Sequence, residues 1–314
     1  MTQPLALGID IGGTNTSYGI VNRRGEIIAK GSMLTTGHDT VHDYIAALTR
    51  NLEPMLLAAG RQHVQGVGIG APNGNFFTGE IVFAPNLPWK GVMIPLVKLL
   101  NESLNLPCAL TNDANAAAIG EMMYGAAKGI NDFVLVTLGT GVGSGFVANG
   151  KLIYGHDGFA GELGHIIAVR DGRMCGCGRR GCLEAYCSAT GIVLSAEEWL
   201  QQRTDDTLLR NSEEPITARM IHEAALQGDA MALELLEYTG KILGQTLADI
   251  VVITSPQAII FFGGLAQAGD LLFGHVRRHM EHNMLNIFKN KVAFIQSALP
   301  GADAAILGAS ALVW

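Results

Sequence analysis

The sequence has 314 residues, of which 48% are hydrophobic and 16% charged, with 40 glycines and a formal net charge of -7 at pH 7. This composition is typical of a folded α/β enzyme and not of a disordered or fibrous protein. The net negative charge gives no electrostatic support for nucleic-acid binding. The length is enough for two domains with separate cores or for one large domain.

The first ten residues carry neither a basic segment nor a long apolar run, so we expect no signal peptide. No uncharged stretch reaches the roughly 20 residues that a membrane span requires. We therefore expect a cytoplasmic protein without a membrane partner. In that reducing compartment its five cysteines are expected to be free thiols or metal ligands rather than disulfides.

The N-terminal segment predicts a strand over 5–11, a Gly-rich turn and two further strands. Asp10 ends the first strand beside Gly12, Gly13 and Thr14. A carboxylate there suits a cation that is bound together with a phosphate, because glycines let backbone N–H groups approach an anion closely. An ordinary Gly-rich hairpin would explain the same residues, so both interpretations stay open.

One loop after the next predicted elements carries a polar and an aromatic side chain. Helical spacing over 41–59 and a strand over 64–70 precede the loop that contains Asn86 and Trp89. If exposed, these side chains suit hydrogen bonds to sugar hydroxyls and stacking on a sugar ring, although turn formation alone explains them equally well.

A strand over 107–111 then leads into Asn112 and Asp113, and a helix follows. The carboxyl ends of strands are where open α/β folds bind ligands. Asp113 would also serve as the N-cap of the helix, and that interpretation stays open.

The second half of the chain repeats the opening pattern. A strand over 133–138 is followed by a Gly/Thr turn with Thr140 and Gly141, a second strand, and a Gly turn before two aliphatic residues. This indicates an internal repeat of a β-meander, whose two hairpins are expected to hold a polyphosphate from both sides.

The segment 195–250 is predicted to be mostly helical, and a strand over 258–262 follows it. Gly263 and Gly264 end that strand, where they would let a planar ring lie against the backbone or would form a tight turn. The small residues of 302–313 predict a helix that packs closely on another element.

Three thiols and one imidazole are grouped in the middle of the sequence. Cys175, Cys177 and Cys182 have the spacing C-x-C-x4-C, and His165 lies ten residues before the first of them. This set predicts a tetrahedral His/Cys3 zinc site. The Gly-rich loop has no core of its own, so the metal would supply its stability. Three incidental reduced thiols are the alternative.

Two carboxylates, Glu162 and Glu184, flank this cluster in the sequence. Carboxylates are good acceptors for sugar hydroxyls, and a zinc-bound His165 would have its second ring nitrogen free to point at one. The alternative for each glutamate taken singly is a solvated surface side chain.

Five motifs in this order resemble the ROK family of repressors, open reading frames and sugar kinases. They cover essentially the whole chain, and no motif position departs from the family pattern. The motifs are Asp10-Ile-Gly-Gly-Thr, Thr111-Asn-Asp-Ala-Asn-Ala-Ala, Leu138-Gly-Thr-Gly-Val-Gly, Ala160-Gly-Glu-Leu-Gly-His and Cys175-Gly-Cys-Gly-x-x-Gly-Cys-Leu-Glu.

The resemblance implies an actin-like (ribonuclease H-like) sugar kinase fold, with two α/β domains around a deep cleft and a zinc-binding loop in the second domain. It places the small domain at 1–112 plus 302–314 and the large domain at 113–301. It also implies a homo-oligomer, either a dimer or a tetramer.

The resemblance further implies roles for individual residues. Asp113 is expected to be the general base. The expected hexose ligands are Asn73, Asn86, Asn112, Glu162, His165 and Glu184. The expected phosphate contacts are Gly12, Gly13, Thr14, Thr140 and Gly141, with Asp10 holding the cation and Gly263 and Gly264 at the nucleoside. The expected zinc ligands are His165, Cys175, Cys177 and Cys182.

The implied activity is ATP-dependent, Mg²⁺-assisted phosphorylation of the 6-hydroxyl of an aldohexose, with glucose expected as the substrate, as in glycolysis. Kinases for N-acetylmannosamine, N-acetylglucosamine, fructose or allose share nearly the same motifs and stay open as alternatives. A sugar-sensing regulator is a further alternative, but only nine residues precede Asp10. That is too few for a helix-turn-helix module.

Overall fold

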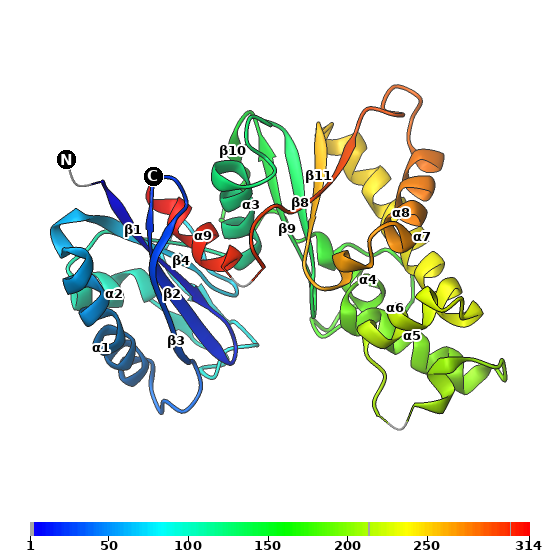
Figure 1. Cartoon of the computed structure of the whole chain (residues 1–314), viewed down its shortest axis with the longest axis horizontal. Coiled ribbons are helices and arrows are strands. Elements are labelled where there is room, and N and C mark those ends of the chain that lie inside the picture. The colour runs from blue at the N-terminus through cyan, green and yellow to red at the C-terminus, as the bar shows by residue number, and fades with distance from the viewer. Residues whose placement is uncertain (1–2, 213, 302) are drawn as a thin grey trace. The chain divides into compact units, whose positions relative to one another are not determined.

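Two five-stranded sheets with the same strand arrangement form the framework of the protein (Figure 1). The structure is a computed structural model that describes residues 3–212, 214–301 and 303–314. The first sheet has the order β3 (Ile27–Leu34), β2 (Asn15–Asn22), β1 (Leu5–Ile11), β4 (Val64–Gly70) and β7 (Cys108–Thr111). The second has the order β10 (Lys151–Leu152), β9 (Val142–Ala148), β8 (Phe133–Leu138), β11 (Ala258–Phe262) and β12 (Ala293–Gln296).

Each sheet combines a meander with two parallel strands. In the first, β1, β2 and β3 pair antiparallel, and β4 and β7 continue parallel to β1. In the second, β10 pairs antiparallel with β9, and β11 is parallel to both β8 and β12. The predicted repeat of the β-meander is therefore confirmed, and it extends to the parallel strands. A separate short hairpin consists of β5 (Ile81–Val82) and β6 (Met93–Ile94).

The residues group into two compact units by packing. The first contains Met1–Asn131, Gly145–Gly161 and Ser297–Trp314, and the second contains Asp132–Ser144 and Glu162–Gln296. The expected domain limits, 1–112 plus 302–314 and 113–301, stay a prediction. Two of those limits, Met1 and Ala302, lie outside the described residues.

Helices cover both faces of the first sheet (Figure 1). α1 (Val41–Ala59) and α2 (Leu96–Leu104) lie on one face, and α3 (Asp113–Tyr124) lies with α9 (Ala304–Ser310) on the other. α9 packs so closely that a Cβ on Gly68 would lie 1.9 Å from the Ala309 carbonyl oxygen. The predicted close packing of the C-terminal small-residue helix is thus confirmed. The chain ends in the 3-10 helix η5 (Ala311–Val313).

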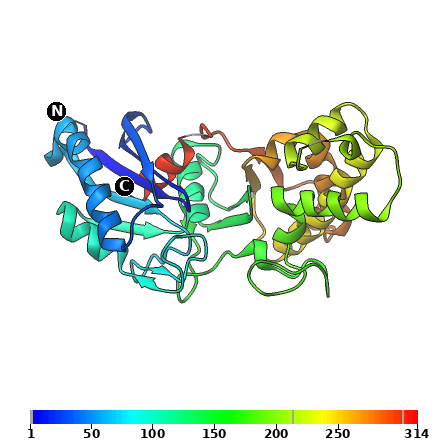
Figure 2. The same cartoon turned by 90° about the horizontal axis from the view of Figure 1, so that it is seen from below.

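The second unit is mostly helical outside its strands. Its longest helix, α7 (Ala230–Thr254), lies beside α8 (Asp270–Asn283), in yellow and orange in Figures 1 and 2. The others are α4 (Glu184–Cys187), α5 (Ala189–Gln202) and α6 (Ala218–Leu226). Short 3-10 helices are η1 (Arg61–His63) in the first unit and η2 (Leu163–His165), η3 (Leu208–Asn211) and η4 (Leu265–Ala268) in the second.

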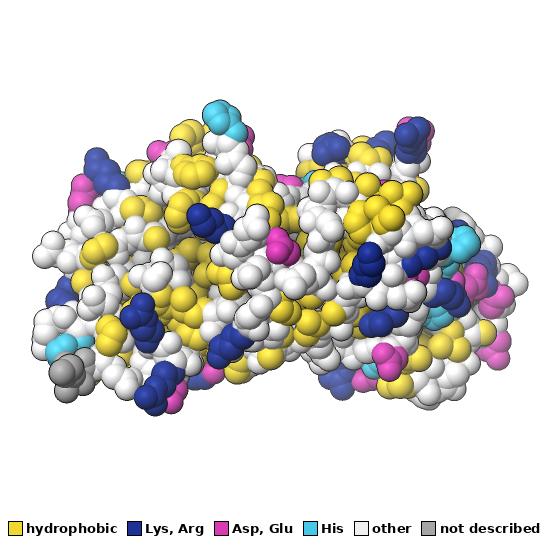
Figure 3. All heavy atoms as spheres, turned by 90° about the horizontal axis from the view of Figure 1, so that it is seen from above, with side chains coloured by type: hydrophobic (Ala, Val, Ile, Leu, Met, Phe, Trp, Pro, Cys, Tyr) yellow, Lys and Arg dark blue, Asp and Glu magenta, His cyan; other side chains and the backbone are white. Residues whose placement is uncertain are grey.

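On the face in Figure 3, Lys and Arg side chains are spread over the surface, some of them beside Asp, Glu or His side chains. Within the described part of the chain, every helix is too short or too polar to cross a membrane.

Candidate active site and metal centre

Asp10 and Asp113 lie at the same edge of the first sheet. Asp10 pairs in register with Gly70 of β4, and Gly70 pairs with Thr111 of β7. A Cβ on Gly70 would lie 3.5 Å from Asp10 Oδ1 and 3.8 Å from Asp113 Cα. Both aspartates therefore lie beside Gly70 at the carboxyl ends of neighbouring parallel strands, where ligands bind in such sheets.

Asn112, and not Asp113, caps α3. Asn112 has an extended backbone, and its Oδ1 accepts a hydrogen bond from the Asn115 N–H at 2.7 Å. The N-cap interpretation of Asp113 is therefore wrong. Asp113 is the first helical residue, its Oδ1 accepts from the Ala114 N–H at 2.8 Å, and its side chain is exposed. The adjacent asparagine satisfies the helix terminus, which leaves the Asp113 carboxylate available to a ligand.

Desolvation raises the pKa values of both aspartates. Burial, with a further contribution from the negative charge of Asp113, raises the pKa of Asp10 to about 7. Desolvation by the surrounding protein also raises the pKa of Asp113, against the opposing effect of its backbone hydrogen bonds. Solvent reaches the Asp113 side chain and screens part of this effect. Perturbed neighbouring carboxylates of this kind are typical of functional sites.

The Gly12–Gly13 turn follows β1 and meets the loop that contains Asn86. The Gly12 N–H donates to the Asn15 carbonyl at 2.9 Å, and the exposed Thr14 lies within this turn. A Cβ on Gly13 would lie 2.5 Å from the Asn86 carbonyl oxygen. Only glycine permits this approach, so the predicted phosphate turn and one predicted sugar ligand lie in direct contact.

Asn73 lies in a left-handed turn after β4, with φ of 52°. Its Nδ2 donates to the Val82 carbonyl at 2.9 Å. This amide therefore holds its own turn, and the predicted sugar contact of Asn73 stays a prediction.

Trp89 is not the exposed stacking residue that the sequence suggested. It is partly buried against the core of the first unit, and its ring lies 4.8 Å from the ring of Tyr44 at an angle of 53°. The tryptophan anchors the loop internally, and Asn86 is exposed.

Glu184 lies against the Gly/Thr turn between β8 and β9. Its Oε2 accepts from the Val142 N–H at 3.0 Å, and a Cβ on Gly141 would lie only 2.2 Å from the same oxygen. The Gly139 N–H closes the turn by donating to the Gly141 carbonyl at 3.0 Å, and Thr140 is exposed at its tip. The turn and the carboxylate are thus fixed to each other.

Gly263 and Gly264 follow β11 at the corresponding edge of the second sheet. Gly263 has φ of 106°, and a Cβ there would lie 2.6 Å from the Leu138 carbonyl oxygen at the end of β8. No heavy atom lies within 4 Å of a Cβ on Gly264. The open space at Gly264 fits the predicted approach of a planar ring, whereas Gly263 is required by the backbone.

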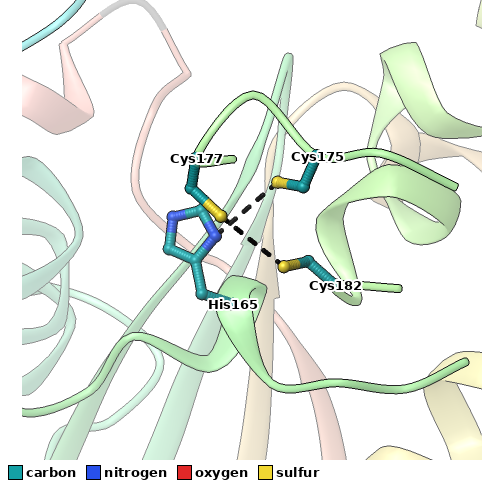
Figure 4. A group of neighbouring side chains, drawn as sticks. All are labelled: His165, Cys175, Cys177 and Cys182. Atoms are coloured by element: carbon teal, nitrogen blue, oxygen red, sulfur yellow. Dashed lines mark hydrogen bonds between the residues drawn. The ribbon is translucent and has the colours of Figure 1, made fainter. Parts of the chain in front are cut away.

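His165, Cys175, Cys177 and Cys182 converge with their ligand atoms all within 4.8 Å of one another (Figure 4). Cys175 Sγ lies 3.9 Å from His165 Nδ1, and the Sγ atoms of Cys177 and Cys182 are 3.7 Å apart. Tetrahedral zinc with Zn–S bonds of about 2.3 Å and Zn–N bonds of about 2.0 Å would place neighbouring ligands roughly 3.5–3.8 Å apart. The donor set and its spacing therefore fit zinc.

Backbone hydrogen bonds form this cluster from a short hairpin. The Cys175 N–H donates to the Arg179 carbonyl at 2.8 Å, and the Gly178 N–H returns to the Cys175 carbonyl at 2.9 Å. An isolated β-bridge between Ile167 and Cys182 brings the segment after His165 to the third thiol. The four side chains thus face one point although the loop is short and Gly-rich.

Glu162 and His165 are placed by η2, which lies next to β9. The Leu163 N–H donates to Ser144 Oγ at 3.2 Å, and a Cβ on Gly164 would lie 2.1 Å from the Val142 carbonyl oxygen. Glu162 is exposed and His165 half-buried. Because Nδ1 of His165 faces the thiols, its Nε2 is the nitrogen that remains for another partner.

Sequence reasoning missed Arg173, which fastens the hairpin to α4 and α5. Its guanidinium donates to the carbonyls of Ala185 and Gly191, and to the Glu198 carboxylate from Nε at 2.8 Å. Its position two residues before Cys175 was a signal that could have drawn attention to it. Its partners, however, are two backbone carbonyls and the side chains of Ser195 and Glu198, which lie 22 and 25 positions later, so no local pattern marks the contact.

Together the two sheets, the paired glycine turns and the thiol loop define an α/β phosphotransferase of the sugar kinase type. The ROK family description matches residues 6–314, and the chain belongs to this family.

Similar proteins extend over nearly the full length. The chain is 35% identical to a glucokinase of Halalkalibacterium halodurans, over 100% of this chain and 96% of that protein. It is also 35% identical to an N-acetylmannosamine kinase of Escherichia coli, over 85% of each. The crystal structure of a ROK family glucokinase from Streptomyces griseus in complex with glucose and AMPPNP superposes with a TM-score of 0.79 at 32% identity, over 98% of both chains.

Proposed function

We propose that this protein transfers the γ-phosphoryl group of ATP to the 6-hydroxyl of glucose. The pair of carboxylates at the ends of β1 and β7, Asp10 and Asp113, is the observation that carries the proposal. Phosphoryl transfer needs a group that accepts the hydroxyl proton and a centre that balances phosphate charge, and these two aspartates suit the two tasks.

Asp113 is the general base of this proposal. Its carboxylate is exposed and is not consumed by the helix cap, because Asn112 performs that task. It accepts the proton of the 6-hydroxyl as the oxygen meets the γ-phosphorus, so that the O–H bond breaks while the new O–P bond forms and ADP leaves. The raised pKa brings the carboxylate closer to the range in which a base accepts a proton effectively.

The sugar ligands of this proposal are Glu162, His165, Glu184, Asn112 and Asn86, with Asn73 as an additional contact. Their side chains would exchange hydrogen bonds with the sugar hydroxyls. The half-buried carboxylate of Glu184 already has a fixed orientation through the Val142 N–H, which reduces the ordering cost of binding.

The phosphate contacts of this proposal are the glycine turns that follow β1 and β8. The nucleoside lies against Gly263 and Gly264, where a side chain is absent.

Asp10 would hold Mg²⁺ in the complex with ATP. Its raised pKa shows that its ionised form is poorly compensated by protein groups, and a divalent cation would stabilise that form. Mg²⁺ supplies neutralisation of the developing phosphate charge when it is bound.

His165, Cys175, Cys177 and Cys182 would hold a structural zinc ion. Zinc supplies a rigid cross-link to the loop rather than a reaction step. The thiols must be reduced and ionised to bind it, so we place the protein in the cytoplasm. We also propose that it assembles as a homo-oligomer, dimer or tetramer, as the family resemblance implies.

N-acetylmannosamine is the second candidate substrate, since a kinase for that sugar matches most of the chain at the same identity as the glucokinase. A coupled assay of ADP release with Mg²⁺ and a panel of hexoses decides between them. The proposal expects the highest kcat/KM for glucose. A higher value for N-acetylmannosamine, or no sugar-dependent ADP release at all, would contradict it.

A further inference from the structure

Tyr44 is a fully buried tyrosine between the two loops of the first unit to which we have assigned the phosphates and the sugar. It lies in the first turn of α1, and 0% of its surface is exposed. Its hydroxyl faces the strand that follows the Gly12–Gly13 turn, and its ring faces the loop that contains Asn86. No motif in the sequence singles this residue out.

A chain of hydroxyl groups connects Tyr44 to the glycine turn. The Tyr44 hydroxyl and Thr16 Oγ1 are 2.8 Å apart, and Thr16 Oγ1 lies 2.8 Å from Thr35 Oγ1. The Thr35 N–H in turn donates to the Thr14 carbonyl at 2.8 Å. All three hydroxyls are buried, so they have no solvent to replace a lost partner. This buried network therefore fixes the backbone of the Gly12–Thr14 turn.

The ring of Tyr44 supports the other loop. It packs against the Trp89 ring at a centroid distance of 4.8 Å. Trp89 lies three residues after Asn86, whose carbonyl contacts Gly13. The two loops thus meet directly at one point and indirectly through one buried side chain. The charge of Asp10 contributes, after burial, to the raised pKa of Tyr44, in agreement with a position beneath the same site.

We propose that Tyr44 is a positioning residue that couples the nucleotide and sugar sites, because its hydroxyl fixes the Gly12–Thr14 turn while its ring fixes the Asn86–Trp89 loop. This inference rests on the proposed function of these two loops. Coupling of this kind is a free energy shared by two ligands, so each ligand strengthens binding of the other by the same factor.

Tyr44→Phe tests the hydroxyl alone, because it keeps the ring against Trp89. Loss of one hydrogen bond corresponds to roughly a two- to twelvefold change in an equilibrium constant. We expect the KM for ATP to rise in that range, while the dissociation constant of glucose measured without nucleotide stays as in the wild type. The factor by which a non-hydrolysable ATP analogue tightens glucose binding should fall.

Trp89→Leu tests the other side and remains informative if Tyr44→Phe folds poorly. It removes the ring contact but leaves the hydroxyl network intact. We expect glucose binding to weaken more than ATP binding, and the coupling factor to fall again. A general loss of packing would instead raise the KM for ATP and the dissociation constant of glucose together, in Tyr44→Phe and in Trp89→Leu alike.

Tyr124→Phe is the matched control. The Tyr124 hydroxyl accepts from the Trp314 indole, and the Tyr124 ring lies beside Gly25, at the opposite end of β2 from the glycine turn. If Tyr44→Phe gives the same ATP KM and coupling factor as this control, the positioning role is wrong. Wild-type protein is assayed first. If it releases no ADP with glucose, the proposed function fails, whereas an active wild type with an unaffected Tyr44→Phe variant overturns the role of Tyr44 alone.

Discussion

The Glu184 carboxylate accepts a hydrogen bond from the Val142 N–H at 3.0 Å across 42 positions of sequence. This contact joins the segment after the thiol loop to the glycine turn between β8 and β9. The other carboxylate oxygen lies 3.8 Å from the Cys175 thiol. Glu184 therefore links the proposed metal centre to a proposed phosphate turn. A change in either neighbour should alter the position of this carboxylate and weaken sugar binding.

Gly141→Ala should displace Glu184, because the new Cβ would lie 2.2 Å from its carboxylate oxygen. A lost hydrogen bond to a charged group corresponds to about a ten- to hundredfold loss of affinity. We expect the KM for glucose to rise by that factor. Gly139→Ala is the control in the same turn, because no heavy atom lies within 4 Å of its Cβ. Equal glucose KM values for both variants would contradict the role of this contact.

Cys177→Ser should release zinc and raise the KM for glucose by about tenfold, because His165 and Glu184 lose the cross-link that orients them. Metal content is measured by elemental analysis of the purified protein, alongside steady-state kinetics. Cys108→Ser, a half-buried thiol of the first unit, serves as the control that keeps both zinc and affinity. A zinc-free Cys177→Ser variant with a normal KM would refute the anchoring role.

Asp10→Asn should stabilise the ligand-free protein, and more at pH 8 than at pH 5. Burial raises the pKa of Asp10 in the native state to about 7, against 3.8 for an ordinary aspartate, so the native state binds the proton more tightly. Stability contributed by this group therefore falls as pH rises from about 4 to about 7. Denaturant unfolding at both pH values measures the difference, and ATP with Mg²⁺ should stabilise the wild type more than the variant. If the variant exceeded the wild type in free energy of unfolding by the same amount at pH 5 and pH 8, the raised pKa of Asp10 would not be the cause.

Segments with continuous apolar runs between glycines could be predicted from the sequence almost to the residue. The strands 5–11, 64–70, 133–138 and 258–262 and the helix 41–59 have the observed bounds. The thiol cluster was also predictable, because few other structures require that set of residues at that spacing. In these segments the local pattern and the tertiary structure agree.

Contacts that depend on distant parts of the chain could not be predicted in the same way. The sequence cannot tell whether Asn112 or Asp113 caps α3, since both are good N-cap residues. It suggested an exposed Trp89, because the partner ring of Tyr44 lies 45 positions earlier. The contact of Glu184 with Gly141 could not be predicted from the sequence either, since it arises from the packing of two separate loops.

The most direct measurement is a comparison of glucose binding and turnover in Asp113→Asn. The amide keeps the shape of the side chain and an oxygen that can accept from the Ala114 N–H, but it cannot take the hydroxyl proton. A positioned base contributes about 10²–10⁴ in rate, so we predict a loss of kcat on that scale with an unchanged dissociation constant for glucose. A variant that binds glucose and turns over at the wild-type rate would contradict the role of Asp113 as the base.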